Sequence, residues 1–203
     1  MKSGHKLLGL CLLVLSACIG AAAPAPAAAP TAAPVAAPAA APAAHKSDPA
    51  QLEADWWRDN RWRYQNDDEA NAAYQRLLVQ QSPWPEWHQV QIANLPAGLR
   101  FQMALAPGQP TDKPGGFGTY DLIPNVHFVR YRLAVKVAWK PAIDRVVTYE
   151  ITDPLPADTG TVGPQIDTDA GHYLPGGGSQ FEMKVPASER MAHLKIVAVR
   201  PIQ

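Results

Sequence analysis

The residues that could carry acid–base, nucleophilic or metal chemistry are scattered along this chain of 203 residues. The segment Asp167-Thr168-Asp169-Ala170-Gly171 has the carboxylate spacing with which a calcium loop begins, but it lacks the further oxygen ligands and the terminal glutamate. Metal-ligand spacing and the Gly-x-Ser-x-Gly context of a nucleophile are missing around the candidates, which are His88, His127, His172, His193, Ser82, Ser179 and Ser188. We therefore predict no catalytic residue, no metal and no cofactor, and expect a protein that is not an enzyme. The sequence leaves open only a catalytic site assembled from residues that are distant in the chain.

The clearest candidate for a binding site is a cluster of aromatic residues. Five of the six tryptophans lie between Trp56 and Trp87, two of them in Trp84-Pro85-Glu86-Trp87. One interpretation is a stacking platform, on which Trp84 and Trp87 contact a glycan ligand or a partner. The other is packing, because each aromatic side chain buries on the order of 150–250 Å². Packing is favoured, since several of these positions fall on helical stripes and Trp87 leads directly into an expected strand.

Two helices are predicted to position these rings. Asp48-Pro49-Ala50-Gln51 offers a cap residue, a proline at the first helical position and a glutamine at capping-box spacing, so a helix begins here and ends near Tyr64. Asn66 and Glu69 repeat the spacing before a second apolar stripe, which Ser82-Pro83 ends.

From His88 onward apolar residues recur at every second position, which is typical of strands with one buried face. The expected strands cover 90–92, 99–105, 129–139, 147–151, 181–185 and 193–199, of which 129–139 is the strongest. The residues 94–98 predict a hairpin turn between the first two strands. One shared core is expected to contain Phe101, Met103, Leu133, Val135 and Val137.

The N-terminus has the layout of a secretory signal. Lys2 and Lys6 precede an apolar run too short to span a bilayer, which needs about 20 residues. Leu15-Ser16-Ala17-Cys18, at the end of that run, resembles the bacterial lipobox. The resemblance implies cleavage before Cys18 and acylation of this cysteine, and Ile19 in place of aspartate favours the outer membrane. An ordinary signal peptide is the alternative.

Residues 20–44 are almost entirely alanine and proline. Recurrent proline disfavours helix, so we expect a polyproline II-like tether that rises about 3.1 Å per residue, or a spacer with no required reach. No cysteine follows Cys18, which excludes an internal disulfide in the mature chain.

The charge balance excludes one class of partner. The chain has 18 basic and 18 acidic residues, and loss of Lys2 and Lys6 with the signal leaves a small acidic excess. Nucleic acid is therefore not expected as a partner. The expected partners are the membrane through the lipid anchor and an envelope protein, with peptidoglycan as a further possibility.

The segment from Tyr131 to Val185 supports a fold class. Asp153-Pro154-Leu155-Pro156-Ala157 followed by Pro175-Gly176-Gly177-Gly178-Ser179 resembles the Ig-like repeat domains of bacterial surface proteins. The resemblance implies a mainly β, antiparallel Ig-like or transthyretin-like β-sandwich, preceded by a short helical pair. The predicted organisation is a signal peptide (1–17), a lipidated cysteine with its linker (18–46), a helical segment (47–86) and a β-sandwich domain (87–203).

Together these features predict a lipid-anchored periplasmic protein at the outer membrane. Its expected role is structural or interactive in the cell envelope, as an accessory to an envelope-spanning assembly. A glycan- or peptidoglycan-binding module that uses Trp84 and Trp87 is the alternative.

Overall fold

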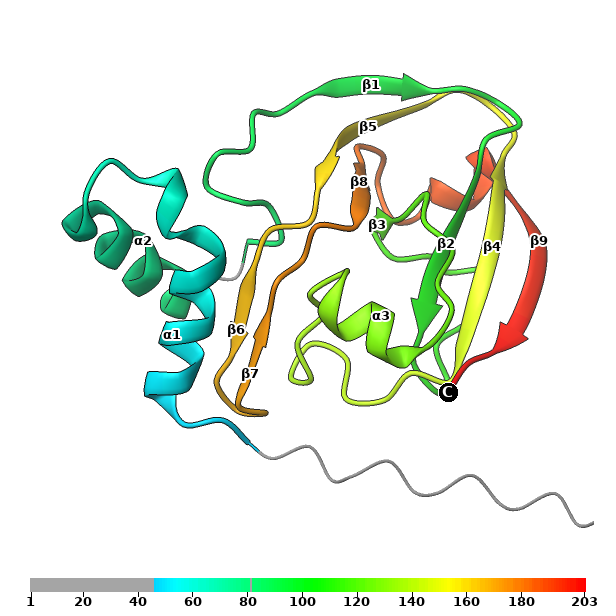
Figure 1. The fold of residues 1–203 in the computed structure, drawn as a ribbon. Coiled ribbons are helices and arrows are strands. Elements are labelled where there is room, and N and C mark those ends of the chain that lie inside the picture. The colour runs from blue at the N-terminus through cyan, green and yellow to red at the C-terminus, as the bar shows by residue number, and fades with distance from the viewer. Residues whose placement is uncertain (1–45, 81) are drawn as a thin grey trace, which may run out of the picture. The chain divides into compact units, whose positions relative to one another are not determined.

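The computed structural model of the chain describes residues 46–80 and 82–203 (Figure 1). The predicted signal peptide, Cys18 and almost all of the Ala/Pro-rich linker lie outside the described residues. Their assignments therefore stay predictions.

Two helices begin the described chain, as the sequence predicts, and a short 3-10 turn lies between them. They are α1 (Pro49–Asn60), η1 (Arg61–Arg63) and α2 (Asp67–Val79). The Asp48 carboxylate accepts a hydrogen bond from the Gln51 amide at 2.8 Å, with Pro49 at the start of the helix. The Asn66 side chain accepts one from the Glu69 amide at 2.9 Å. Both caps satisfy amides that have no partner within their helix.

The rest of the chain forms antiparallel sheets, so the expectation of a mainly β fold with a few helices is confirmed (Figure 1). One sheet has the order β1-β5-β8-β3, a second has the order β2-β4-β9, and β6 pairs with β7. The strands are β1 (Ile92–Leu95), β2 (Arg100–Leu105), β3 (Phe117–Gly118), β4 (Arg145–Ile151), β5 (Leu155–Thr161), β6 (Gln165–Asp167), β7 (His172–Leu174), β8 (Ser179–Met183) and β9 (Leu194–Pro201). The Ig-like or transthyretin-like form of the arrangement stays a prediction.

The main core contains residues from both larger sheets. Phe101 of β2 lies 4.9 Å from Phe181 of β8 and 5.4 Å from Tyr149 of β4, measured between ring centroids. All three side chains are buried, as is Met103. The two sheets are therefore held together by aromatic packing rather than by a disulfide.

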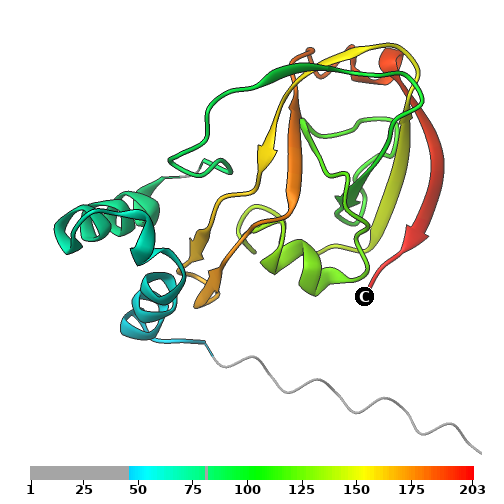
Figure 2. The ribbon, with the colours of Figure 1, turned by 45° about the horizontal axis from the view of Figure 1, so that its top comes forward.

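The helices pack on the β6–β7 hairpin, beside which they lie in both ribbon views (Figures 1 and 2). Trp56 of α1 is buried in a cluster that includes Ile166 and Tyr173 from the hairpin. Asn60, also buried, donates a hydrogen bond to the Tyr173 hydroxyl at 2.9 Å. For Trp56 the packing interpretation is therefore correct.

The prediction of a strand over residues 129–139, the strongest of the expected strands, is wrong. Its first part belongs to α3 (Val126–Tyr131), which is capped by the Asn125 side chain, and Ala134 then takes a left-handed φ of 47°. Short apolar runs fit helix and strand spacing alike, and the cap decides the first turn here. The Arg130 guanidinium fixes the loop that follows, because it donates to the carbonyls of Val135 and Lys140.

The predicted shared core is wrong for the same segment. Leu133 and Val135 are half-buried in a cluster with Ile123 and Val129, apart from the Phe101 and Met103 core. Val137 is 37 % exposed.

The predicted hairpin over residues 94–98 is also wrong. The turn exists, with Gly98 at a φ of 86°, but β1 pairs with β5 and β2 pairs with β4. The two strands flanking the turn therefore enter different sheets, because each finds a partner elsewhere in the chain. The Gly98 amide donates to the Ile151 carbonyl at 2.7 Å, so the turn joins the end of β4.

Candidate functional site

A cavity of about 230 Å³ opens beside β2 and β3. Its walls come from β2, the glycine-rich segment 115–119, the loop after α3, Lys140 and Gln180 of β8. The apolar part of the lining consists of Met103, Leu105, Phe117, Ile123, Leu133 and Val135. These elements lie far apart in sequence, and the misassigned 129–139 segment supplies one wall.

Lys140 provides the positive charge of the cavity. Its ammonium donates to the Ala104 carbonyl at 2.7 Å and to the Gln109 side-chain carbonyl at 3.3 Å. Burial lowers the Lys140 pKa below its ordinary value, and the nearby charges of Arg130 and Arg145 lower it further. An ammonium has three donors, so one N–H remains for a ligand.

Two glutamine amides line the same cavity with different roles. The Gln102 carbonyl accepts from the Ile123 amide at 2.8 Å, and its NH₂ donates to Thr148 at 3.2 Å, so this amide is used inside the fold. The Gln180 NH₂ donates to the Pro83 carbonyl at 3.3 Å. Within the described part of the chain the Gln180 carbonyl oxygen has no hydrogen-bond donor, which leaves an acceptor in the lining.

Close packing fixes the glycine-rich wall. A Cβ at Gly118 would lie 2.5 Å from the Phe181 ring and 2.8 Å from the Phe101 ring, so only glycine fits between the wall and the core. The neighbouring Phe117 ring is 43 % exposed at the edge of the cavity. The shape of this wall is thus set by the main core.

A second polar cluster joins the segment after α2 to β5. His88 Nε2 lies 3.2 Å from an Asp158 carboxylate oxygen that also accepts the Gln91 amide at 2.9 Å. The His88 ring stacks on Trp84, with centroids 4.1 Å apart. The His88 and Asp158 side chains are 9 % and 2 % exposed, and a Cβ at Gly160 would lie 2.6 Å from the imidazole. This cluster therefore fixes the segment after α2 against β5 by buried polar contacts and close packing.

The two tryptophans predicted as possible binding residues, Trp84 and Trp87, contact different neighbours. Trp84 is half-buried against His88, which agrees with the packing interpretation. Trp87 is 45 % exposed, so its predicted packing is wrong, and its ring stacks on the Arg63 guanidinium at 4.2 Å. Arg63 lies at the same distance over the Trp62 ring, which is 70 % exposed. We call Trp62, Arg63 and Trp87 the aromatic clamp.

In the 167–171 segment, Asp167 stabilises turns. The Asp167 carboxylate accepts the Val137 amide at 2.6 Å and the Ala170 amide at 3.1 Å. Residues 46–80 and 82–203 contain no cluster of histidine, cysteine and acidic side chains fit to hold a metal ion. Among the helices of these residues, none has the length and apolar character that crossing a membrane requires.

Sequence reasoning missed the residues that line the cavity. Lys140 directly follows the expected 129–139 strand, and Gln180 directly precedes the expected 181–185 strand. The glycines at 115, 116 and 118 lie between the expected strands 99–105 and 129–139, and nothing in the sequence indicates what they face. Only the pairing of distant strands brings these positions together.

Comparison with known proteins gives partial structural likenesses. No protein family and no curated protein matches the chain. One chain of the solved structure of Tne2 in complex with Tni2 aligns at 28 % identity, over 59 % of this chain and 99 % of that chain, with a TM-score of 0.47. Rhs1-CT with its cognate immunity protein RhsI1 aligns at 18 %, over 57 % and 82 %, with a TM-score of 0.37. Tse6 with Tsi6 aligns at 14 %, over 73 % and 96 %, with a TM-score of 0.39.

These findings correct the predicted function. A structural protein of the cell envelope was expected, with a glycan-binding module as the alternative. The chains that align instead come from solved structures of two-protein complexes, one of which contains a cognate immunity protein. The envelope role and its glycan-binding alternative are therefore withdrawn.

Proposed function

We propose that the domain binds a small, largely apolar molecule carrying an anionic or carbonyl oxygen, in the cavity between β2, β3 and Lys140. The observation that carries the proposal is the combination, in one cavity, of apolar walls and a lysine with a donor to spare. Ligand sites have this composition: mostly apolar lining with a few polar groups that fix orientation.

The cavity volume sets the size of the ligand. About 230 Å³ is less than the roughly 300–1,000 Å³ of sites for drug-sized molecules, whereas a cavity of about 150 Å³ binds benzene. A single substituted ring therefore fits. The ring would contact Leu133 and Val135. Its oxygen substituent would accept a hydrogen bond from the third N–H of the Lys140 ammonium.

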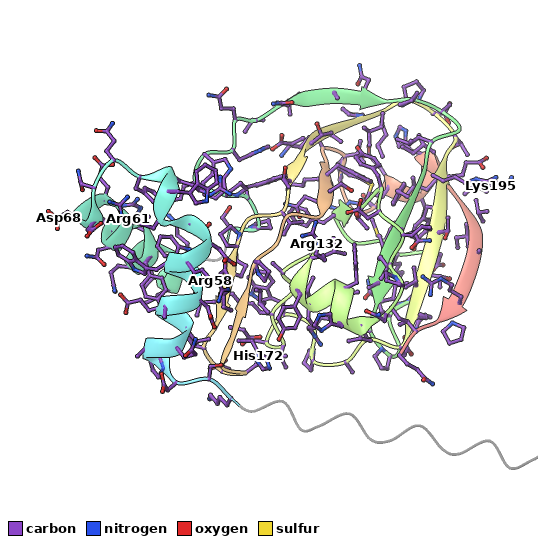
Figure 3. All side chains as sticks on the ribbon, viewed as in Figure 1. Arg58, Arg61, Asp68, Arg132, His172 and Lys195 are labelled. Atoms are coloured by element: carbon purple, nitrogen blue, oxygen red, sulfur yellow. The ribbon has the colours of Figure 1, made fainter. Side chains whose placement is uncertain are left out.

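Benzoate and benzylamine test the proposal, because they share a ring and carry opposite charges. We expect calorimetry on the full chain to give a Kd on the order of 1 mM for benzoate and binding at least about tenfold weaker for benzylamine. Lys140→Met should remove the preference, and Lys195→Met, a lysine on exposed β9 (Figure 3), should keep it. Equal affinities for the two probes would refute the proposal.

A protein partner is the second candidate, and the aromatic clamp favours it. Tryptophan and arginine are enriched among the residues that dominate protein interfaces. A photo-crosslinker at position 62 should give a discrete product in cells, and one at position 195 should not. The identified partner, expressed separately, should bind the chain at least about tenfold more weakly after Trp62→Ser. Unchanged affinity would exclude the clamp from the interface.

Attachment of lipid to Cys18 and placement at the outer membrane, facing the periplasm, also remain our proposals. They rest on the Leu15-Ser16-Ala17-Cys18 motif and on Ile19 directly after it. Two or more acyl chains give stable anchoring where one is marginal. Labelled palmitate should enter the wild-type chain and not Cys18→Ser, and label in the variant would refute the anchor.

A further inference from the structure

We propose that the aromatic clamp recognises a carboxylate side chain on an acidic segment of the partner protein. This inference rests on the proposed protein partner and names the chemistry of its contact. Its centre is Arg63, at the end of η1.

The Arg63 guanidinium lies over two indole rings. Its central carbon lies 4.2 Å from the centroid of Trp62 and 4.2 Å from that of Trp87. Stacking of this kind occupies the faces of the planar group and leaves its N–H donors around the edge. Those edge donors match the two oxygens of a carboxylate.

Among the described residues Arg63 forms no ion pair, in contrast to the arginines around it. Arg58 pairs with Asp55 at 2.7 Å, Arg61 with Asp67 at 2.5 Å and Arg76 with Glu86 at 2.6 Å. Arg58 and Arg61 lie on and just after α1 (Figure 3). Within residues 46–80 and 82–203, the Arg63 guanidinium makes ring contacts but no hydrogen bond or ion pair. Its donors are free for a partner.

The surroundings of Arg63 favour an anion that is partly removed from water. Trp62, Arg63, Tyr64, Glu86 and Trp87 line a hollow of about 370 Å³. Its one acidic group is neutralised, because Arg76 donates to both Glu86 oxygens, at 2.6 and 3.1 Å. An entering carboxylate therefore meets a free cation between apolar rings and no uncompensated negative charge.

The clamp is also held in place before binding. The Trp62 indole donates to the Asp59 carbonyl at 2.9 Å, and Glu86 connects the Tyr64 hydroxyl, at 3.5 Å, to Arg76. Groups that are ordered in the free protein lose little conformational entropy on association. The structure thus assigns Arg63 the role of a preorganised carboxylate receptor.

Two matched peptides test the assignment on the full chain. The first is acetyl-Gly-Glu-Leu-Glu-Gly-amide, and the second has glutamine in place of both glutamates. The acidic peptide should shift the NMR signals of the Arg63 Nε–H and of both clamp indoles, whereas the glutamine peptide should bind at least about tenfold more weakly. Arg63→Gln and Arg63→Lys should each lower affinity for the acidic peptide, since lysine lacks the planar fork.

Arg100→Gln is the matched control, because Arg100 is an exposed arginine on β2 that already pairs with Glu150 at 2.8 Å. It should leave the affinity unchanged, and thermal melting should show that all variants fold. Equal binding of both peptides, an equal loss in Arg100→Gln, or no binding at all would overturn the inference. Stronger Arg63-dependent binding of inorganic phosphate or of phosphatidylglycerol vesicles would also overturn it. If the position-62 crosslink succeeds while these peptides fail, the protein partner stands and its carboxylate chemistry falls.

Discussion

Lys140 shows how a charge can be retained at the edge of an apolar cavity. Its ammonium donates to the Ala104 and Gln109 carbonyl oxygens, which replace part of the hydration lost on burial. The Lys140 pKa is nevertheless lowered, chiefly by burial and then by Arg130 and Arg145. An anionic ligand would stabilise the buried ammonium, because its oxygen would replace a hydrogen bond to water that burial removes.

The lowered Lys140 pKa predicts a pH dependence of stability. Between the lowered folded pKa and the ordinary value of 10.5, the unfolded chain binds this proton more strongly than the folded chain does. The penalty for burying the charge is therefore full below that window and shrinks as the pH rises through it. In urea titrations, the free energy of unfolding of the wild type should rise relative to Lys140→Met toward pH 10.5. A difference that stays constant or falls would contradict the assignment, and Lys195→Met serves as the control.

Trp84 and Trp87 should differ in what they contribute to stability. Trp84 is half-buried and stacks on His88, so Trp84→Ala should cost on the order of 1–3 kcal/mol of unfolding free energy. Trp87 is 45 % exposed and stacks on Arg63, so Trp87→Ala should cost less than about 1 kcal/mol. Chemical denaturation of the two variants checks this, and the reverse order would show that Trp87 is the packing residue.

Among the elements, α3 and the loop after it determine the shape of the cavity. They replace the predicted 129–139 strand and place Leu133 and Val135 in the lining. The short helix depends on its cap, since six residues are too few for a helix to be stable by itself. Asn125 accepts the Phe128 amide at 2.9 Å and so determines where the helix begins.

Removal of this cap should therefore cost stability. Asn125→Ala is expected to lower the free energy of unfolding by about 1 kcal/mol, within the range for N-cap substitutions. It should also weaken benzoate binding through the displaced wall. Asn94→Ala is the control, because Asn94 is exposed on β1 and makes no side-chain hydrogen bond among the described residues. Equal stability of the two variants would show that the cap is dispensable.

The sequence predicts those elements whose signals are local. The caps at Asp48 and Asn66, together with the β2 and β4 alternation, can be read from neighbouring residues and are confirmed. The partner of a strand is not a local property, so the sequence predicts a hairpin at 94–98 although β1 pairs with β5. The cavity is likewise built from residues distant in the chain, since Gln180 and Lys140, 40 residues apart, both line it.

The whole domain is organised around the core between the two larger sheets. Phe181 is fully buried there and contacts the rings of Phe101 and Tyr120. Leu133 belongs to the separate cluster beside the cavity and is only half-buried. The two positions therefore differ in what they contribute to global stability.

This difference predicts a ranking. Phe181→Ala should cost about 3–5 kcal/mol of unfolding free energy, and Leu133→Ala about 1–2 kcal/mol. Urea unfolding monitored by circular dichroism measures both values. If Leu133→Ala lowered the unfolding free energy as much as Phe181→Ala, the cluster that contains Leu133 would contribute as much to stability as the core around Phe181, which would contradict the ranking.

The account depends most on the cavity, and the position of a bound ligand tests it directly. In a ¹⁵N–¹H NMR titration of the full chain with benzoate, we predict shifts in the backbone amides of residues 102–105 and 115–119 and at Gln180. The amides of residues 62–64 and 86–88, at the aromatic clamp, should stay unchanged. Shifts confined to the clamp, or spread evenly over the surface, would contradict the claim that this cavity is the binding site.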